Sequence, residues 1–178
     1  MDMLAHGLWG GALVSIAYRN RPIARLTLPI TIGMAVWPDI AHAVPLVFWW
    51  ILGDGTWSAL VAYAFATPGQ EPVLPANVAL LSHHFHCLAH SVIVAGTVTL
   101  TLWLILRSIW TPLIGWGSHI LIDIFTHSAD YYAVPILYPL NEWGFDGIAW
   151  NTPWFIGLNY SVLGAIYLWI LQQKRKAT

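Results

Sequence analysis

The chain has 178 residues, of which 58% are hydrophobic and 8% are charged, and its formal net charge is −1. Because soluble domains carry about 25% charged residues, this composition excludes an ordinary soluble protein and predicts a polytopic membrane protein with one domain, residues 1–178. The near-zero net charge gives no reason to expect a nucleic-acid partner, and the single cysteine, Cys87, excludes an internal disulfide.

The apolar segments, taken in chain order, predict an all-α membrane helix bundle of about five spanning helices. These helices are expected at about residues 2–18, 22–37, 77–110, 112–130 and 153–171. Between the second and the third of them, residues 40–66 are apolar but interrupted at Gly53-Asp54-Gly55, so that neither half is long enough to span a bilayer. We expect this stretch to form an interfacial helical hairpin.

Proline residues and segment lengths indicate where helices end or bend. Pro29 is expected to kink the second helix and Pro38 to end it, with Asp39 capping the helix that follows. Segment 77–110 would be roughly 50 Å long as one helix, against a hydrocarbon core of about 30 Å. Its first third is therefore expected to project beyond the membrane or to break.

The charges predict an orientation. All seven Lys and Arg residues lie at residues 19–25, at Arg107 or at residues 174–176, and all eight Asp and Glu residues lie toward the opposite ends of the helices. By the positive-inside rule the basic turns are cytoplasmic, which places the N-terminus outside and the C-terminus inside. No secretory signal pattern precedes the first apolar run.

Ionisable residues occur at one depth in four segments. Counted at about 1.5 Å per residue, they lie roughly 20–25 Å from the nearest cytoplasmic turn. These residues are His6, Asp39, His90 and Asp123. Ionisable residues inside membranes are rare and generally face a polar cavity or one another. We therefore expect a shared site in the outer half of the membrane.

The segment Ser118–Asp130 adds a polar stripe to an apolar helix. His119, Asp123 and His127 follow at i, i+4 and i+8. His119 and Asp123 can share one metal ion, but His127 lies about 12 Å along the axis from His119, too far to join them around an ion with bonds of about 2 Å. Either there are two ions, or His127 supports the ligands or acts catalytically; we predict His127 as the catalytic residue.

Imidazole and carboxylate ligands from several helices are typical of a metal site in a helix bundle. Such ligands suit zinc, with manganese or iron as alternatives, and the prediction is one or two divalent ions. The predicted metal ligands are His6, Asp39, His90, His119 and Asp123. Additional candidates are His42, His83, His84 and His86.

The chain also resembles the bacterial family of inner-membrane-associated metal-dependent hydrolases, often described as LexA-regulated. The matching pieces are His6 followed by glycines, Pro38-Asp39 with His42 close behind, His90-Ser91, SHILID at 118–123 and ILYPLNEWG at 136–144. The order of His and Asp residues is similar, more distantly, to zinc-dependent phospholipase C. These resemblances imply a multi-pass protein of the bacterial inner membrane with a phosphoester or lipid-like substrate.

The sequence therefore leaves three alternative functions open. The first is a membrane-bound metal-dependent hydrolase that acts at the extracytoplasmic face on a lipid or phosphoester. The second is a haem- or metal-binding membrane protein, or a proton relay. The third is a non-catalytic subunit that associates with other membrane subunits, which departures from the family pattern around His84 and at Ala41 favour.

Overall fold

The computed structural model describes residues 1–20, 22, 24–66, 70–130 and 133–177. Arg21 of the predicted basic turn, and parts of two predicted loops at 67–69 and 131–132, lie outside the described residues. Over the described ranges the fold is all-α, as predicted, and contains no strand. The helices are α1 (Met3–Ala17), α2 (Thr27–Ala41), α3 (Ala43–Leu52), α4 (Trp57–Ala64), α5 (Ala76–Ala89), α6 (Val92–Leu106), α7 (Leu113–Thr126) and α8 (Pro153–Ala177).

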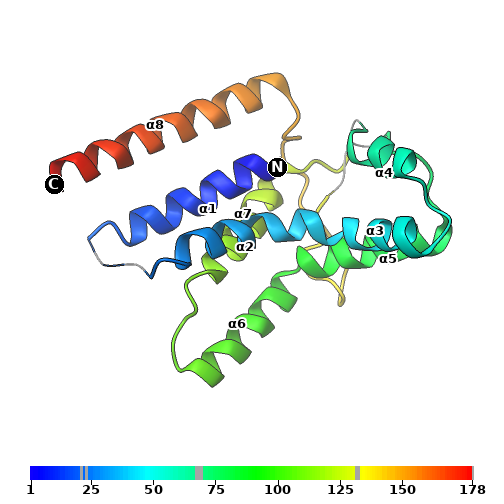
Figure 1. The fold of residues 1–178 in the computed structure, drawn as a ribbon, viewed down its shortest axis with the longest axis horizontal. Coiled ribbons are helices and arrows are strands. Elements are labelled where there is room, and N and C mark those ends of the chain that lie inside the picture. The colour runs from blue at the N-terminus through cyan, green and yellow to red at the C-terminus, as the bar shows by residue number, and fades with distance from the viewer. Residues whose placement is uncertain (21, 23, 67–69, 131–132, 178) are drawn as a thin grey trace.

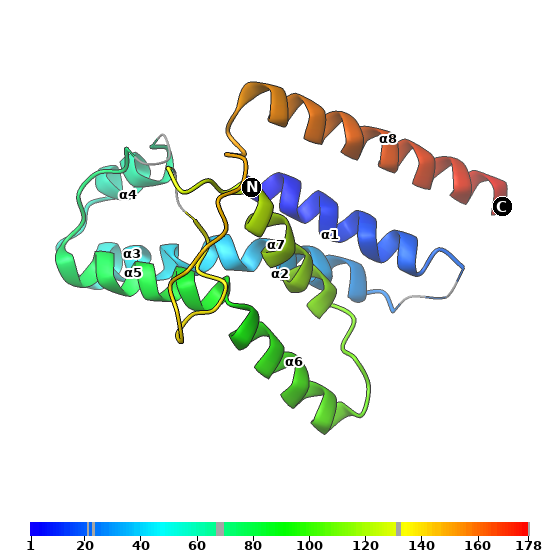
Figure 2. The ribbon, with the colours of Figure 1, turned by 180° about the vertical axis from the view of Figure 1, so that it is seen from behind.

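Helix α7 lies at the centre of the fold, where it packs against α1 and α2 (Figure 1). Helix α8 runs along the outer side of α1, and α3 lies beside α5 at the other end of the molecule. Seen from behind, α6 leaves the bundle and returns to α7 through a loop (Figure 2). The contacts between α1, α2 and α7 therefore form the frame for any site that these helices share.

Small residues let α1, α2 and α7 approach one another closely. A Cβ atom on Gly10 of α1 would lie 2.7 Å from the Cβ atom of Ala35 on α2. A Cβ atom on Gly115 of α7 would overlap the carbonyl oxygen of Thr31, also on α2. Glycine at these positions removes the steric barrier to close helix packing, an effect that also operates between helices in membranes.

Helix α2 does not end at Pro38, so the predicted helix end is wrong and Asp39 is not a cap. Pro38 and Asp39 lie inside α2, which continues to Ala41. The internal proline removes one hydrogen bond, and the packing of α2 against both α1 and α7 offsets this cost. The break follows at His42, because Pro45 in the first turn of α3 has no N–H to donate to Ala41.

The long segment predicted at 77–110 breaks into α5 and α6, which meet at an angle of 57°. His90 ends α5 and Ser91 caps α6, where the Ser91 hydroxyl accepts hydrogen bonds from Ile93 N (3.1 Å) and Val94 N (3.2 Å). The same hydroxyl donates to the carbonyl oxygen of Tyr138 in the loop before α8. The break therefore places His90 at a helix junction inside the fold.

The described helices give fewer membrane spans than the five predicted. Helix α8 is long and apolar enough to cross a membrane over Pro153–Arg175. Two bent pairs, α2 with α3 (64°) and α5 with α6 (57°), qualify if each pair counts as one span, which gives up to three spans in the described residues. Helices α1 and α7 are apolar but have only 15 and 14 residues, so the five spans are not confirmed.

Candidate metal centre

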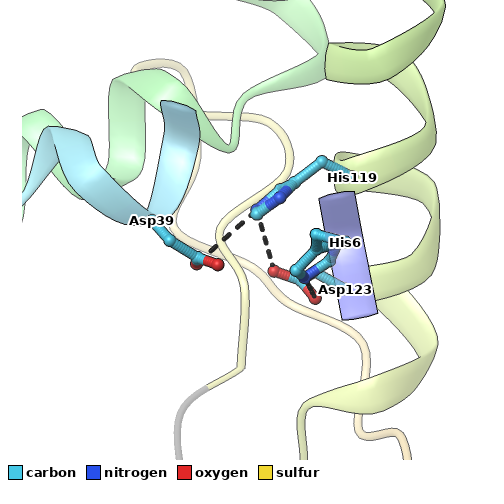
Figure 3. Close-up of side chains that lie close together, drawn as sticks. All are labelled: His6, Asp39, His119 and Asp123. Atoms are coloured by element: carbon cyan, nitrogen blue, oxygen red, sulfur yellow. Dashed lines mark ion pairs between the residues drawn. The ribbon is translucent and has the colours of Figure 1, made fainter. Parts of the chain in front are cut away.

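Four of the predicted ligands converge where α1, α2 and α7 meet. His6 comes from α1, Asp39 from α2, and His119 and Asp123 from α7, and one ligand atom of each lies within 4.8 Å of the others (Figure 3). His6, His119 and Asp123 have no exposed surface, and Asp39 is partly buried. The ring of His6 stacks on that of His119, with 3.7 Å between the ring centroids.

His90 reaches the same group of atoms from the junction of α5 and α6. Its Nε2 atom lies 2.9 Å from His119 Nε2, 3.4 Å from Asp123 Oδ2 and 3.9 Å from Asp39 Oδ1. The ring is fully buried. The structure thus brings together all five residues that the sequence predicts as metal ligands, and we refer to them as the His/Asp cluster.

Backbone carbonyl groups fix the proton positions on two of the rings. The Nδ1 atom of His119 lies 2.7 Å from the carbonyl oxygen of Ala35, and the Nδ1 atom of His90 lies 2.9 Å from that of His86. A carbonyl oxygen only accepts hydrogen bonds, so each Nδ1 donates its proton and each Nε2 of the neutral ring presents a lone pair. The two Nε2 lone pairs face each other, an arrangement that is repulsive unless a proton or a cation lies between them.

The distances in the cluster fit a small divalent cation. Bonds of about 2.0–2.1 Å in a tetrahedral zinc site place neighbouring ligand atoms about 3.3 Å apart. The Nε2 atoms of His90 and His119 lie 2.9 Å apart. Each of these two atoms also lies between 3.1 and 3.9 Å from Asp39 Oδ1 and from Asp123 Oδ2. The backbone acceptors on both Nδ1 atoms orient the rings, as the outer hydrogen bonds of metal-binding histidines do.

The two oxygen atoms of Asp123 face different partners. Oδ2 faces His119 Nε2 at 3.1 Å and His90 Nε2. Oδ1 accepts from the Met1 amino group at 2.5 Å and from the Thr126 hydroxyl at 3.3 Å, and lies 2.9 Å from His6 Nε2. Thr126 follows Asp123 by three residues on α7, so the helical period can place it beside the carboxylate, whereas no periodic signal points from Met1 to Asp123.

Several buried polar atoms of the cluster have no hydrogen-bond partner. These atoms are Nδ1 and Nε2 of His6, Oδ2 of Asp39 and Oδ2 of Asp123. A buried polar atom left without a partner costs about 1–3 kcal/mol, and more when it belongs to a charged group. A divalent cation would bind the carboxylate oxygens and one nitrogen of the neutral His6 ring and would balance the two carboxylates, so the residues present fit a metal ion.

His127 lies close to the cluster, four residues after Asp123 and just past the end of α7. The prediction that residue 127 continues the helix is wrong: α7 ends at Thr126, and His127 has an extended backbone with φ −116° and ψ 135°. Its Nδ1 atom lies 3.2 Å from the carbonyl oxygen of Asp123 and 3.6 Å from Asp123 Oδ1. Burial lowers the pKa of His127 to about 4, so the ring is neutral at pH 7.

The four additional candidates lie outside the cluster. The His86 ring stacks on that of His90 with 3.9 Å between centroids, and the His42 ring is 6.1 Å from that of His86. The Nδ1 atom of His84 pairs with the Tyr138 hydroxyl at 2.5 Å. The exposed His83 lies next to Cys87 on α5, with 3.5 Å between His83 Nε2 and the sulfur atom.

A cavity of about 840 Å³ opens beside the cluster, a volume in the range of small-molecule sites. Asp39 and His127 contribute to its wall and so connect it to the cluster. The rest of the wall comes from the N-terminus, His42, α4 and the segment after it, α5 and Trp150. We refer to this space as the α4–α5 cavity.

No protein-family model, no curated protein and no solved structure matches the chain. The resemblance to inner-membrane-associated metal-dependent hydrolases therefore stays a prediction. The features that bear on function are the chemistry of the His/Asp cluster and the lining of the α4–α5 cavity.

Proposed function

We propose that this protein is a membrane-embedded, metal-dependent hydrolase that acts on a phosphoester or lipid-like substrate. One observation carries the proposal: the lone pairs of His90 and His119 face each other beside two carboxylates, one of which, Asp39, lines a large cavity. Such a set of neutral imidazoles and carboxylates is the donor set of zinc hydrolases. Zinc is accordingly the first choice of metal, with manganese and iron as alternatives.

The proposed ligands of the ion are His90, His119, Asp39 and Asp123. A bound divalent ion would lower the pKa of a water ligand to about 7 and polarise the scissile phosphoryl or acyl group. His6, which lies on the Oδ1 side of Asp123, completes the shell or holds a second ion.

His127 is proposed as the residue that accepts a proton from the attacking water. The ring lies against Asp123 and lines the α4–α5 cavity. Its Nδ1 proton is donated to the carbonyl oxygen of Asp123, so Nε2 is the proton acceptor of the neutral ring. A positioned general base contributes about 10²- to 10⁴-fold to the rate.

The geometry argues against haem as the bound group. A bis-histidine haem requires a porphyrin between two facing imidazoles. The Nε2 atoms of His90 and His119 are 2.9 Å apart, which leaves no room for one. A bare metal ion is therefore the better occupant.

We further propose that the protein is a multi-pass protein of the bacterial inner membrane with its C-terminus in the cytoplasm. The long apolar helix α8 and the two bent helix pairs support membrane insertion. The Lys and Arg residues at three helix ends support the orientation, because such residues are enriched on the cytoplasmic side. The His/Asp cluster would then open toward the extracytoplasmic face.

His127→Ala removes the proposed general base and tests its role in hydrolysis. We expect the purified protein to hydrolyse amphiphilic phosphodiesters or acyl esters, to lose this activity with a chelator and to regain it with zinc. His127→Ala should lower kcat by about 10²- to 10⁴-fold while metal content is unchanged, because the base is lost but the ligands remain. His84→Ala, which also removes an imidazole but outside the cluster, should retain wild-type kcat. Chelator-insensitive hydrolysis, or no hydrolysis of any such ester by the metal-loaded protein, would overturn the proposal.

A further inference from the structure

The charged residues of the α4–α5 cavity are unusual for a site that would bind phosphate groups. Three carboxylates line it, Asp2, Asp39 and Glu71, together with Met1, whose amino group is already paired with Asp123. Among the described residues no Lys or Arg lines the cavity. Sites for polyanions such as diphosphates and nucleotides use Lys and Arg to neutralise the charge, so this wall disfavours them.

Glu71 shares the wall of the α4–α5 cavity with an aromatic residue. Tyr63 of α4 lines the same wall, and its pKa is raised first by burial and then by the charge of Glu71. The Tyr63 ring lies 6.4 Å from that of His42, which in turn lies 6.1 Å from His86 beside the cluster. A carboxylate together with an aromatic ring is the combination that binds alkylammonium groups.

The inner wall of the cavity holds polar atoms that lack partners. Asp39 Oδ2 and His42 Nδ1 are buried without a hydrogen bond, and both residues line the cavity. Polar atoms that remain unsatisfied next to an open space indicate a ligand with polar groups. The unpartnered His42 nitrogen is independent of the three carboxylates of the wall.

The mouth of the cavity is apolar and exposed. Met3 is 52% and Phe65 is 85% exposed, and both line the cavity. Exposed apolar side chains at the rim of a polar cavity are suited to hydrocarbon chains or a bilayer surface. The ligand should therefore be an amphiphile whose head group enters and whose chain remains outside.

From these features we infer that the α4–α5 cavity binds the head group of an amphiphile that bears an ammonium group, and that Glu71 and Tyr63 form the ammonium subsite. A single phosphodiester or ester group of the same head group would extend toward Asp39 and the His/Asp cluster. The inference deepens the proposed function and depends on it only in treating this amphiphile as the substrate.

The test compares two probes with the same chain and phosphodiester, one with the cationic choline group and one with the neutral glycerol group. Dodecylphosphocholine and dodecylphosphoglycerol share the chain and the phosphodiester, and both are titrated by calorimetry into the full-length protein in non-ionic detergent. The wild type should bind dodecylphosphocholine about tenfold more tightly. Glu71→Lys should remove this preference, and Tyr63→Leu should weaken dodecylphosphocholine binding about threefold, in line with the loss of a partly exposed cation–π contact.

Glu142→Lys is the matched control, because Glu142 is exposed and does not line the cavity. This variant should keep the preference of the wild type. Equal affinities of the wild type for the two probes, or equal effects of Glu71→Lys and Glu142→Lys, would overturn the inference. Binding does not require turnover, so the two proposals can fail separately. A preference for dodecylphosphocholine without any hydrolysis would reject the proposed function alone. Hydrolysis without this preference would reject the ammonium subsite alone.

Discussion

Asp123→Asn should lower the affinity of the protein for zinc by more than about 100-fold and abolish hydrolysis. Both carboxylate oxygens of Asp123 lie in the cluster, Oδ2 facing His90 and His119, and Oδ1 facing His6. Loss of an outer-shell partner alone reduces metal affinity about 10- to 100-fold, and loss of a charged ligand should cost more. The measurement is a zinc titration of the purified, chelator-treated variant against the wild type.

Asp146→Asn is the control for this substitution. The Asp146 carboxylate accepts a hydrogen bond from Ala129 N at 2.7 Å in an exposed loop, outside the cluster. This variant should bind zinc like the wild type. If Asp123→Asn also binds zinc like the wild type, Asp123 is not a ligand and the proposed centre is wrong.

Gly115→Ala should destabilise the fold by about 3 kcal/mol, at the upper end of the range for overpacking in a close-packed interior. Its Cβ atom would overlap the carbonyl oxygen of Thr31 and lie 2.9 Å from Ala35 N. Both of these are backbone atoms, so no side-chain rotation relieves the clash, and α2 must move away from α7. Because Asp39 lies on α2 while His119 and Asp123 lie on α7, this shift should also weaken metal binding.

Gly117→Ala, two residues along the same helix, separates the clash from other effects of replacing glycine. A Cβ atom on Gly117 has no other atom within 4 Å. This substitution should be neutral or should stabilise the helix by up to about 1 kcal/mol, because alanine is the better helix former. The comparison uses thermal unfolding in detergent, and equal melting temperatures for the two variants would contradict the packing described here.

The convergence of the cluster could be predicted because it depends on helix geometry. The basic residues gave a common reference level, and the fixed helical rise then gave His6, Asp39, His90 and Asp123 the same depth. The structure places these residues together with His119. Depth does not depend on the exact helix ends: Asp39 lies inside α2 rather than at a cap, and it still reaches the cluster.

The position of His127 could not be predicted in this way. The i+8 spacing implied a continuous helix, but α7 ends at Thr126 and the extended backbone of His127 brings its ring to Asp123. The backbone carbonyls of Ala35 and His86, which fix the two ring protons, are equally invisible in a sequence. Main-chain acceptors depend on the packing of helices and have no side-chain signature.

The number of membrane spans also depends on information beyond hydropathy. The sequence predicts five spans, whereas within the described part of the chain only α8 qualifies by itself, and two further spans require that bent pairs be counted as one each. Pro45 and Ser91 stand at these bends and can be read as helix starts. Whether a bent pair crosses a bilayer or returns to the same side is set by its partners, not by its composition.

Metal content tests the central claim most directly. The wild-type protein, purified without chelators in non-ionic detergent, is analysed by inductively coupled plasma mass spectrometry and by native mass spectrometry. The account predicts at least one equivalent of a divalent transition metal, with zinc expected first. A wild-type protein that contains no transition metal, and that takes up none when zinc, manganese or iron(II) is added, would contradict it.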